Sequence, residues 1–528
     1  MNEFAMKKQR LEAARRRRRM IFNNDGSCWD YARKPDPQEF LSVTTTGLAD
    51  SHVDAIFYST TETFNWYTHR TKVGEQFNDA NNILDGLRAQ GTDSLQVMID
   101  FCRKHDKELF WSFRVNDEHD AWVASSGAQW KRDHQHCLFG TRDNSPPNGS
   151  WSCVDYTQAE VRDLIFRTIE EVCQNYDIDG IELDFFRQLQ CFKKLAWGQP
   201  LGDSERQIMN DHLRTIRVMM EQVGQQRGRP LLFAVRVPDC PDFAREMGLD
   251  VRHWLEHDLI DIMVVGSYFW LRPWHKSVEL GRQYNVPVYP SLDGSRMTDD
   301  ETRLIRRSDL GYRAAASTAW HQGVDGIYVF NFNYFRNPFQ SVWRELGDPN
   351  ALKELDKIYH VSVMGDGHPD IESYLPDGRR FSQLPRLCPD HPLHMLGGQA
   401  YVTTLTVGDD LSAADREFVP KVTLNVKVTE LANRDLIMVK LNGSELSAGP
   451  LTWQFAIPDD WLEFVVDPKI IQCGDNRIEL HLSGQSNAEE TCIVHEVQLR
   501  LEHGPNARRR RDLTMGQNQH LAFYRSLA

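Results

Sequence analysis

Short apolar runs alternate with amphipathic segments between residues 20 and 360. Eight runs have the length and bounding residues of buried strands: Met20–Asn24, Val53–Ser59, Glu108–Val115, Gly180–Phe185, Leu231–Val237, Ile260–Gly266, Val286–Ser291 and Gly326–Asn331. Helical periodicity separates most of them, at Ala80–His105, Gln158–Tyr176, Ser204–Gln226 and Asp309–Gln322. Thr157 is placed to cap the second of these helices. Eight strand–helix units predict an α/β fold, a (β/α)8 TIM barrel with enlarged loops, over residues 20–360.

The pattern changes after residue 360. Residues 361–395 are rich in proline, glycine and aspartate, which predicts a linker. From 396 to 503 the apolar positions alternate with polar ones, as at Val422, Leu424, Val426 and Val428, and turn signals such as Asn442-Gly443 divide the segments. This predicts an all-β sandwich domain of about eight strands. Residues 1–19 form a basic segment before the barrel, and residues 504–528 form a tail without a clear pattern.

Composition is that of a globular protein with more than one domain. The chain has 528 residues, 41% hydrophobic and 26% charged. No uninterrupted apolar run is long enough for a membrane span, and no apolar segment follows the basic N-terminus as in a secretory signal. Ten scattered cysteines form no CxxC pair, so free thiols in the cytoplasm are expected, with Cys102 and Cys173 in the core.

The charge distribution argues against a polyanionic partner. The net charge is −14, although residues 1–19 hold eight basic and only two acidic side chains. The remainder of the chain is therefore more acidic still, which disfavours nucleic acid as the main partner. The runs Arg15–Arg19 and Arg508–Arg511 are interpreted as a solvated basic helix and tail.

The fourth predicted strand carries two acids, Glu182 and Asp184. Side chains alternate along a strand, so both acids share one face, with Asp184 at the carboxyl-terminal rim and Glu182 one layer deeper. The same parity turns Arg114 of the third strand and Arg236 of the fifth toward the barrel axis. We expect these arginines to pair with the two acids and hold both ionised. A buried ion network that only shapes the barrel is the alternative.

Glycoside cleavage needs two carboxyl groups across the scissile bond. Asp184 is the first candidate. Asp117 and Asp239 end the neighbouring strands and are the candidates for the second, while Asp25 and Asp293 lie farther around the ring. A strand-end aspartate is equally suited to cap the following helix.

Polar and aromatic residues gather at the same strand ends. Aromatic rings stack on the C–H faces of sugars, and amide, imidazole and carboxylate groups bond their hydroxyls. The long loop after the third strand, from about residue 116 to 152, adds tryptophans and histidines. The predicted substrate-binding residues, besides Glu182, Arg114 and Arg236, are Asn116, His119, Trp122, Tyr268, Trp270, Asp293, Asn331 and Asn333.

Other chemistries find little support in the spacing of residues. No HExxH motif is present, so we predict no metal, although Asn116–Asp120 is a polar cluster that a metal-assisted hydrolase would use. Nucleotide-binding motifs and a GxSxG elbow are absent, so no cofactor is expected and a serine hydrolase is disfavoured.

The fourth strand, Asp179-Gly180-Ile181-Glu182-Leu183-Asp184-Phe185-Phe186-Arg187, resembles the DGIxxDxxR signature of the family-10-like glycosyl hydrolase group of barrel glycosidases. The resemblance implies Asp184 as a catalytic residue. The strand is also similar to the DGxDxDxE motif of family 18 chitinases, but Phe186 replaces the acid, which speaks against a substrate-assisted mechanism. The ends Arg114–Asp117 and Tyr328–Asn331 are similar to strand ends of the same group.

Residues 396–503 resemble the galactose-binding-like sandwich that many glycosidases carry, through Val439–Gly443 and Gly474–Leu480. Such a module either binds glycan or braces the barrel, and bracing is expected here because no aromatic platform is evident.

Together these features predict a glycoside hydrolase acting on an oligo- or polysaccharide. Asp184 would be the principal carboxylate, Asp117 or Asp239 the acid/base, and Glu182, Arg114 and Arg236 the supporting residues. The alternatives are a non-catalytic glycan-binding barrel and, third, the metal-assisted hydrolase. A homo-oligomer is compatible with the sequence, which specifies neither the sugar nor its linkage.

Overall fold

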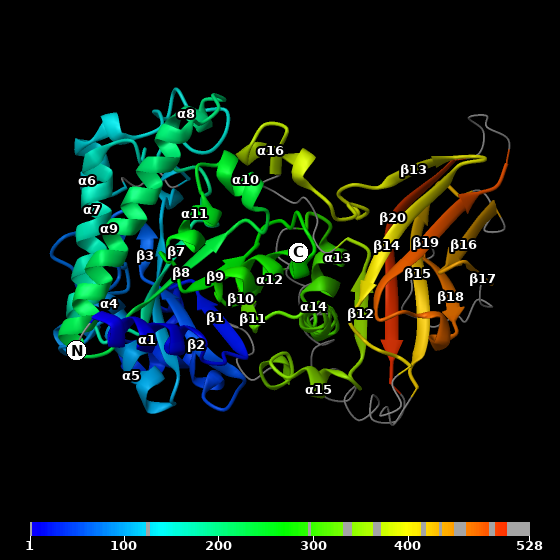
Figure 1. The fold of residues 1–528 in the computed structure, drawn as a ribbon, viewed down its shortest axis with the longest axis horizontal. Coiled ribbons are helices and arrows are strands. Elements are labelled where there is room, and N and C mark those ends of the chain that lie inside the picture. Colours follow the sequence, from blue (N-terminus) through cyan, green and yellow to red (C-terminus); the bar gives the residue numbers. More distant parts are fainter. Residues whose placement is uncertain are drawn as a thin grey trace. The chain divides into compact units, whose positions relative to one another are not determined.

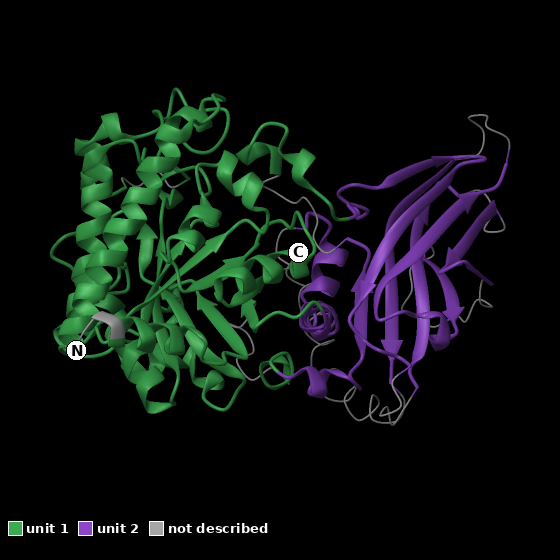
Figure 2. Cartoon of the chain, in the orientation of Figure 1, with its two compact units in different colours: residues 1–296, 322–347, 366–384 green, residues 297–321, 348–365, 385–528 purple. Residues whose placement is uncertain are grey.

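The computed structural model describes residues 3–122, 127–293, 297–330, 341–362, 371–412, 419–431, 436–447, 461–484 and 491–503. Asn331, Asn333, Arg508–Arg511 and the tail lie outside these ranges. The chain forms two compact units that interleave along the sequence (Figure 2). The first comprises residues 1–296, 322–347 and 366–384, and the second comprises residues 297–321, 348–365 and 385–528.

The first unit contains a closed parallel barrel of eight strands, which confirms the predicted fold class. In order around the barrel the strands are β1 (Met20–Asn24), β11 (Ile327–Val329), β10 (Val288–Leu292), β9 (Ile262–Val265), β8 (Leu232–Val237), β7 (Gly180–Asp184), β6 (Glu108–Arg114) and β2 (Val53–Ser59). Nearly every residue of these strands is buried, because the barrel axis and the surrounding helices cover both faces. All eight predicted strands are present.

Helices surround the barrel (Figure 1). The long ones in the first unit are α1 (Glu3–Ala14), α5 (Ser94–Lys104), α7 (Ala159–Asn175), α9 (Asp203–Arg227) and α12 (Trp274–Tyr284). Shorter helical segments are α2 (Cys28–Tyr31), α3 (Pro37–Ser42), η1 (Thr46–Leu48), α4 (Ile83–Ala89), η2 (His119–Ala121), α6 (Gln129–Asp133), η3 (Gln135–Cys137), α8 (Lys193–Ala196), α10 (Pro241–Glu246), α11 (Val251–Glu256), η4 (Ser341–Arg344), α16 (Ile371–Tyr374) and η5 (Gly378–Phe381). A small sheet of β3 (Thr61–Thr63), β4 (Trp66–Tyr67) and β5 (Glu75–Gln76) follows β2.

Two details of the helical predictions are wrong. The segment Ala80–His105 is two helices, because Gly91 adopts a positive φ of 87° and the Asp93 carboxylate then accepts hydrogen bonds from the backbone N–H groups of Leu95 and Gln96 to start α5. The N-cap of α7 is Gln158, without a side-chain bond, and Thr157 donates its hydroxyl to Asp155 instead.

The basic N-terminal segment is built into the barrel unit. Residues Glu3–Ala14 form α1. The guanidinium of Arg10 is buried and lies 2.9 Å from Asp261, and that of Arg18 is buried and lies 2.6 Å from Glu108. Only Arg15, Arg16 and Arg17 of the arginine run are exposed. The expectation that the run Arg15–Arg19 is solvated is therefore wrong for Arg18. The ion pairs of Arg10 and Arg18 offset the cost of burying their charges.

The second unit contains antiparallel sheets, as predicted. One sheet has the order β12 (Lys357–His360), β20 (Thr491–Glu502), β15 (Lys421–Thr429) and β18 (Trp461–Val466), with β13 (Leu393–Leu396) also pairing with β20. The other has the order β14 (Ala400–Val407), β19 (Gly474–Leu482), β16 (Ile437–Leu441) and β17 (Ser444–Leu446). The unit also includes α13 (Asp300–Arg306), α14 (Asp309–His321), α15 (Pro349–Leu352) and η7 (Pro468–Ile470).

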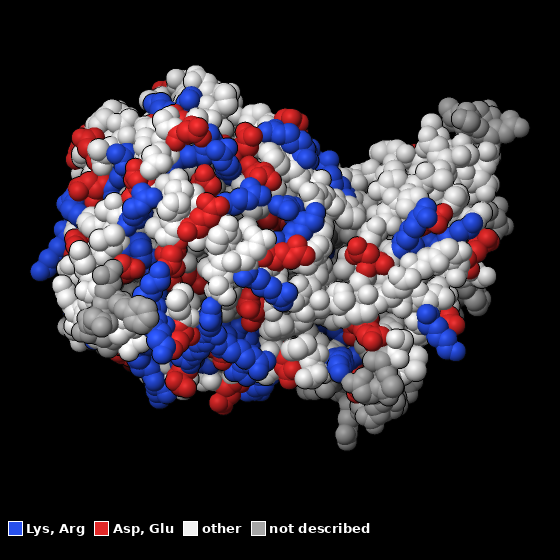
Figure 3. Space-filling view, viewed as in Figure 1, with Lys and Arg blue, Asp and Glu red and all other residues white. Residues whose placement is uncertain are grey.

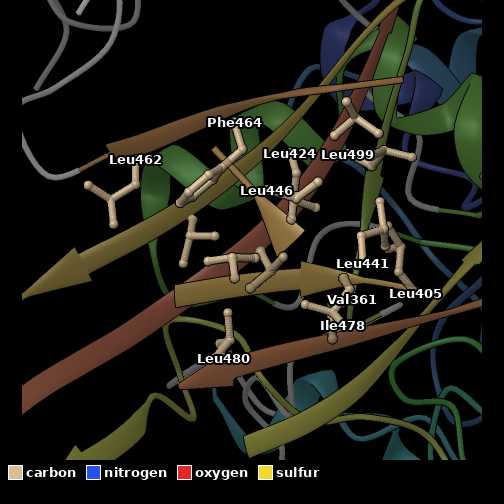
Figure 4. Close-up of a cluster of buried hydrophobic side chains, with 14 of the residues drawn as sticks. Val361, Leu405, Leu424, Leu441, Leu446, Leu462, Phe464, Ile478, Leu480 and Leu499 are labelled. Atoms are coloured by element: carbon tan, nitrogen blue, oxygen red, sulfur yellow. The ribbon is translucent and has the colours of Figure 1, made fainter. Parts of the chain in front are cut away.

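The inward side chains of the two sheets form one apolar core. Leu424, Leu499, Leu441 and Leu480 are fully buried within it (Figure 4). They occupy the alternate positions that the period-two pattern predicts. Strand β12, which falls inside the range expected for the barrel, pairs with β20 of this unit.

The remaining expectations from composition concern the cysteine thiols, membrane-spanning segments and the distribution of charge. All ten cysteines lie within the described residues, and each is a free thiol; Cys102 and Cys173 are buried. Among the described helices none combines the length and apolarity that crossing a bilayer requires. Acidic and basic side chains are intermixed on the face shown in Figure 3.

Candidate active site

Polar side chains from neighbouring barrel strands converge in two layers. Ser112, Glu182 and Ala234 are in register on β6, β7 and β8, and Arg114, Asp184 and Arg236 are in register one layer nearer the carboxyl-terminal rim. Strand parity therefore places the arginines and acids as predicted, but their pairing differs from the prediction.

Glu182 lies deep in the barrel and is fully buried. Its Oε2 accepts hydrogen bonds from Ser112 Oγ at 2.6 Å and from Tyr328 Oη at 3.1 Å, and Asn23 donates to that tyrosine oxygen. Desolvation, with a further contribution from the Asp184 charge, raises the pKa of Glu182 well above its usual range. Arg114 therefore pairs with neither Glu182 nor Asp184, contrary to expectation, and burial disfavours the ionised form of Glu182.

Replacing Glu182 by glutamine is expected to become more favourable as the pH rises. Folding raises the pKa of this acid above its unfolded value, so the folded state binds the extra proton and wild-type stability falls as pH increases above the unfolded pKa. Glutamine keeps the shape without that dependence. Urea unfolding of wild type and Glu182→Gln between pH 5 and about 9 would measure the difference. An unfolding free energy of the variant that does not rise relative to that of wild type as the pH increases would contradict the assignment.

Asp184 is held by Arg236 at the rim. Arg236 Nε lies 2.8 Å from Asp184 Oδ1, its Nη2 bonds Oδ2, and the backbone N–H of Arg187 also donates to Oδ1 at 3.1 Å. Phe330 covers the guanidinium, with its ring centroid 3.8 Å away. This arrangement fixes Asp184 as an ion pair that is 2% exposed.

Arg114 joins two other aspartates. Its Nη2 lies 2.6 Å from Asp25 Oδ1, and its Nη1 lies 3.1 Å from Asp117 Oδ2. Asp25 follows β1, so closure of the barrel brings it to Arg114 of β6 across β2. Although burial opposes ionisation, Arg114 and Arg187 near Asp25, and His119 and Arg114 near Asp117, lower the pKa values of both carboxyls. Both are ionised, and Asp25 remains 24% exposed.

His119 is oriented by Asp117 and Arg187. Its Nδ1 lies 2.6 Å from Asp117 Oδ1, and Arg187 Nη2 donates to its Nε2 at 3.0 Å. Because a guanidinium only donates, Nε2 is the acceptor and Nδ1 carries the proton. Arg187 Nη1 also donates to Tyr268 Oη at 3.0 Å, so Tyr268 lies at the site as predicted.

Glu62 is the acid that sequence reasoning missed. It lies on β3, is partly exposed, and its Oε1 accepts a 2.7 Å hydrogen bond from Trp29 Nε1. Desolvation raises its pKa to about 7; the Trp29 hydrogen bond and the charge of Arg114 oppose this shift, and that of Asp117 adds to it. Glu62 lies in a short segment after β2, and Trp29 lies in a short segment after β1. No spacing in the sequence indicates that the two residues are in contact.

Several predicted site residues serve the loops instead. Both Asp239 oxygens accept from the backbone N–H of Leu271, and Oδ2 also accepts from Arg272. Burial raises the Asp239 pKa to about 7, but these bonds commit the carboxyl to the loop after β9. Asn116 joins two loops through Val154 and Gln190.

Other predicted residues differ in exposure. Trp270 is buried against Gly266, where an added Cβ would meet its ring at 2.5 Å. Trp122 is 74% exposed and Asp293 is buried at the end of β10.

The polar cluster at residues 116–120 has protein partners throughout. Besides the contacts of Asn116, Asp117 and His119, Cys153 Sγ lies 3.4 Å from Glu118, and Lys131 lies 2.9 Å from Asp120. Within the described ranges, these five residues do not form a group whose ligand atoms face one point. The metal-assisted reading of this cluster therefore has no geometric support.

Comparison with known proteins gives distant structural similarity to barrel glycoside hydrolases. No family model and no curated protein matches the chain. The glycoside hydrolase domain of PgaB (BpsB) from Bordetella bronchiseptica aligns over 61% of this chain and 95% of its own, with 10% identity and a TM-score of 0.37. A family 18 N-acetylglucosaminidase from Paenibacillus barengoltzii aligns over 63% and 98%, with 11% identity and a TM-score of 0.35.

A noncanonic maltogenic α-amylase, AmyB from Thermotoga neapolitana, aligns over 88% of this chain and 99% of its own, with 10% identity and a TM-score of 0.35. Scores of this size assign no family and no substrate.

Proposed function

We propose that the chain is a glycoside hydrolase acting on an oligo- or polysaccharide, with Glu62 as the proton donor and Asp25 as the ionised carboxylate. The observation that carries the proposal is that two carboxyl groups at the barrel rim have pKa values shifted in opposite directions. The pKa of Glu62 is raised to about 7, whereas that of Asp25 is lowered. Divergent pKa values of this kind identify acid and base in carboxylate-based glycosidases.

Glu62 and Asp25 differ in the groups that contact their carboxyls. Asp25 has Arg114 at 2.6 Å and Arg187 at 3.5 Å, so its negative charge is stabilised. Glu62 has an indole N–H as its hydrogen-bond donor and no ion pair among the described residues. A protonated Glu62 can transfer its proton to a leaving glycosidic oxygen, and Asp25 can then act on the sugar as nucleophile or activate a water molecule.

The other aspartates position the site in this proposal. Asp117 fixes the tautomer of His119, whose ring is 47% exposed. Asp184 binds the backbone N–H of Arg187, so the Arg236–Asp184 pair holds in place the arginine that reaches Asp25 and His119. The partly exposed indole of Trp29 offers a stacking surface beside Glu62.

The test is the release of new reducing ends from a panel of glycans. Wild type is expected to cleave at least one member, and Asp25→Asn is expected to reduce that rate by about 100-fold or more. Asp163→Asn is a matched control, because Asp163 is exposed on α7 and pairs only with Arg167 among the described residues. Full activity of Asp25→Asn would contradict its assigned role.

A non-catalytic glycan-binding barrel is the second candidate. It is favoured by the pairing of Asp25, Asp117 and Asp184 with arginines, which leaves little uncompensated charge for chemistry. This candidate predicts glycan binding by calorimetry with no new reducing ends from any member of the panel. Cleavage that is lost in Asp25→Asn would exclude it.

A further inference from the structure

A second cluster of reactive side chains lies in the first unit, on the segment between β6 and α7. His136 and Cys137 belong to η3, and Glu160 belongs to the first turn of α7. Glu160 Oε2 lies 2.6 Å from His136 Nε2 and 3.4 Å from Cys137 Sγ. The three potential ligand atoms all lie within 4.8 Å of one another. An imidazole, a thiol and a carboxylate therefore face one point from two separate segments.

The chemistry of this set is more specific than that of an ordinary surface ion pair. The Cys137 side chain is buried, while those of His136 and Glu160 are 59% and 55% exposed. The set therefore combines a buried thiol with an imidazole and a carboxylate that solvent reaches. Thiolate, imidazole and carboxylate are the three side-chain ligands that zinc accepts in tetrahedral sites.

We propose that His136, Cys137 and Glu160 bind a divalent transition-metal ion, with zinc as the best-matched metal and solvent in the fourth position. Zinc–ligand bonds of about 2.0–2.3 Å separate neighbouring ligand atoms by about 3.3–3.8 Å in a tetrahedron. The Cys137–Glu160 separation already falls in this range. The His136–Glu160 separation must widen by about 1 Å, which these exposed side chains can supply by rotation.

Binding requires the loss of a proton. Burial and the adjacent Glu160 raise the pKa of the Cys137 thiol to about 12, so without metal the thiol is protonated. The ion forms a bond to sulfur while the S–H bond breaks and its proton goes to solvent. The His136 imidazole and the Glu160 carboxylate contribute lone pairs from nitrogen and oxygen. Metal affinity is therefore expected to rise with pH.

The site would tie the long loop after β6 to α7. This loop begins with Asp117 and His119, and it includes the segment that carries His136 and Cys137. A metal bridge to Glu160 would restrict the motion of the part of the loop that carries His136 and Cys137. The inference stands independently of the proposed hydrolase activity, because metal binding is measured without a glycan.

The experiment is a cobalt titration of the chelator-treated full-length protein. Cobalt(II) reports a thiolate ligand through a sulfur-to-metal charge-transfer band and tetrahedral geometry through its visible spectrum, and zinc added afterwards should remove both signals. Wild type is expected to bind one equivalent with these signals. Cys137→Ser is expected to lose the charge-transfer band, and Glu160→Gln to weaken binding by about 100-fold or more.

Two matched controls keep the test specific. His134→Ala removes the neighbouring imidazole, which stacks on Trp130 at 4.4 Å and bonds its carbonyl oxygen. Cys473→Ser removes the exposed thiol of the second unit. Both variants are expected to keep the wild-type titration. Absence of a thiolate band in wild type, or its persistence in folded Cys137→Ser, would overturn the proposal; circular dichroism of each variant verifies folding.

Discussion

Replacing Glu62 by glutamine is expected to lower kcat/KM for glycan cleavage by about 100- to 10,000-fold, the usual contribution of a general acid. Glutamine retains the volume of the side chain and a carbonyl oxygen that can accept the Trp29 indole N–H. Its amide has no acidic proton to give to the leaving oxygen. The rate on whichever glycan the wild type cleaves is the measurement, and folding should be unaffected.

The pH profile gives the same claim an independent readout. Glu62 must be protonated to act, so wild-type kcat/KM should fall as the pH rises through about 7. Asp25 must be ionised, and its lowered pKa places the acidic limb below the ordinary range for aspartate. The alkaline limb should disappear in Glu62→Gln and persist in Glu12→Gln, a change on the exposed side of α1. Retention of wild-type activity and of that limb in Glu62→Gln would refute the assignment.

Replacing Arg236 by leucine is expected to destabilise the barrel unit by about 3–5 kcal/mol, because it leaves the Asp184 carboxylate buried without its partner. Arg236 is fully buried and its side chain lies against Phe330. By comparison, Arg167→Leu removes an exposed helix pair with Asp163 and should cost less than about 1 kcal/mol. Urea unfolding followed by circular dichroism measures both changes.

A double variant separates the lost ion pair from lost packing. If the cost arises from an uncompensated charge, Arg236→Leu with Asp184→Leu should recover part of the stability that Arg236→Leu loses. An Arg236→Leu variant as stable as wild type would contradict this account. So would a double variant whose loss of unfolding free energy exceeds the sum of the losses in the two single variants.

The barrel strands could be predicted from sequence because both faces of each strand are buried. That burial requires short, almost continuous apolar runs, and polar residues within such runs are conspicuous. Strand parity then placed Glu182 and Asp184 correctly in depth. Parity gives the direction of a side chain but not its partner. Arg114 lies one layer nearer the rim than Glu182, and its side chain pairs with Asp25 and Asp117 instead.

Glu62 could not be found in the same way. It lies in a threonine-rich segment after β2 and meets Trp29 only because the barrel closes β1 onto β2. Its raised pKa depends on burial by residues that are distant in sequence. The role of Arg18 was hidden for a similar reason, since a run of arginines resembles a solvated segment until each acidic partner is known.

The most direct test of the central claim is a titration of the Glu62 carboxyl itself, which requires no substrate. Infrared difference spectra of wild type minus Glu62→Gln should isolate the protonated-carboxyl band of this residue between pH 4 and about 9. We predict that the band converts to carboxylate with a midpoint of about 7. A midpoint near 4.3, the value for an unperturbed glutamate, would contradict the account.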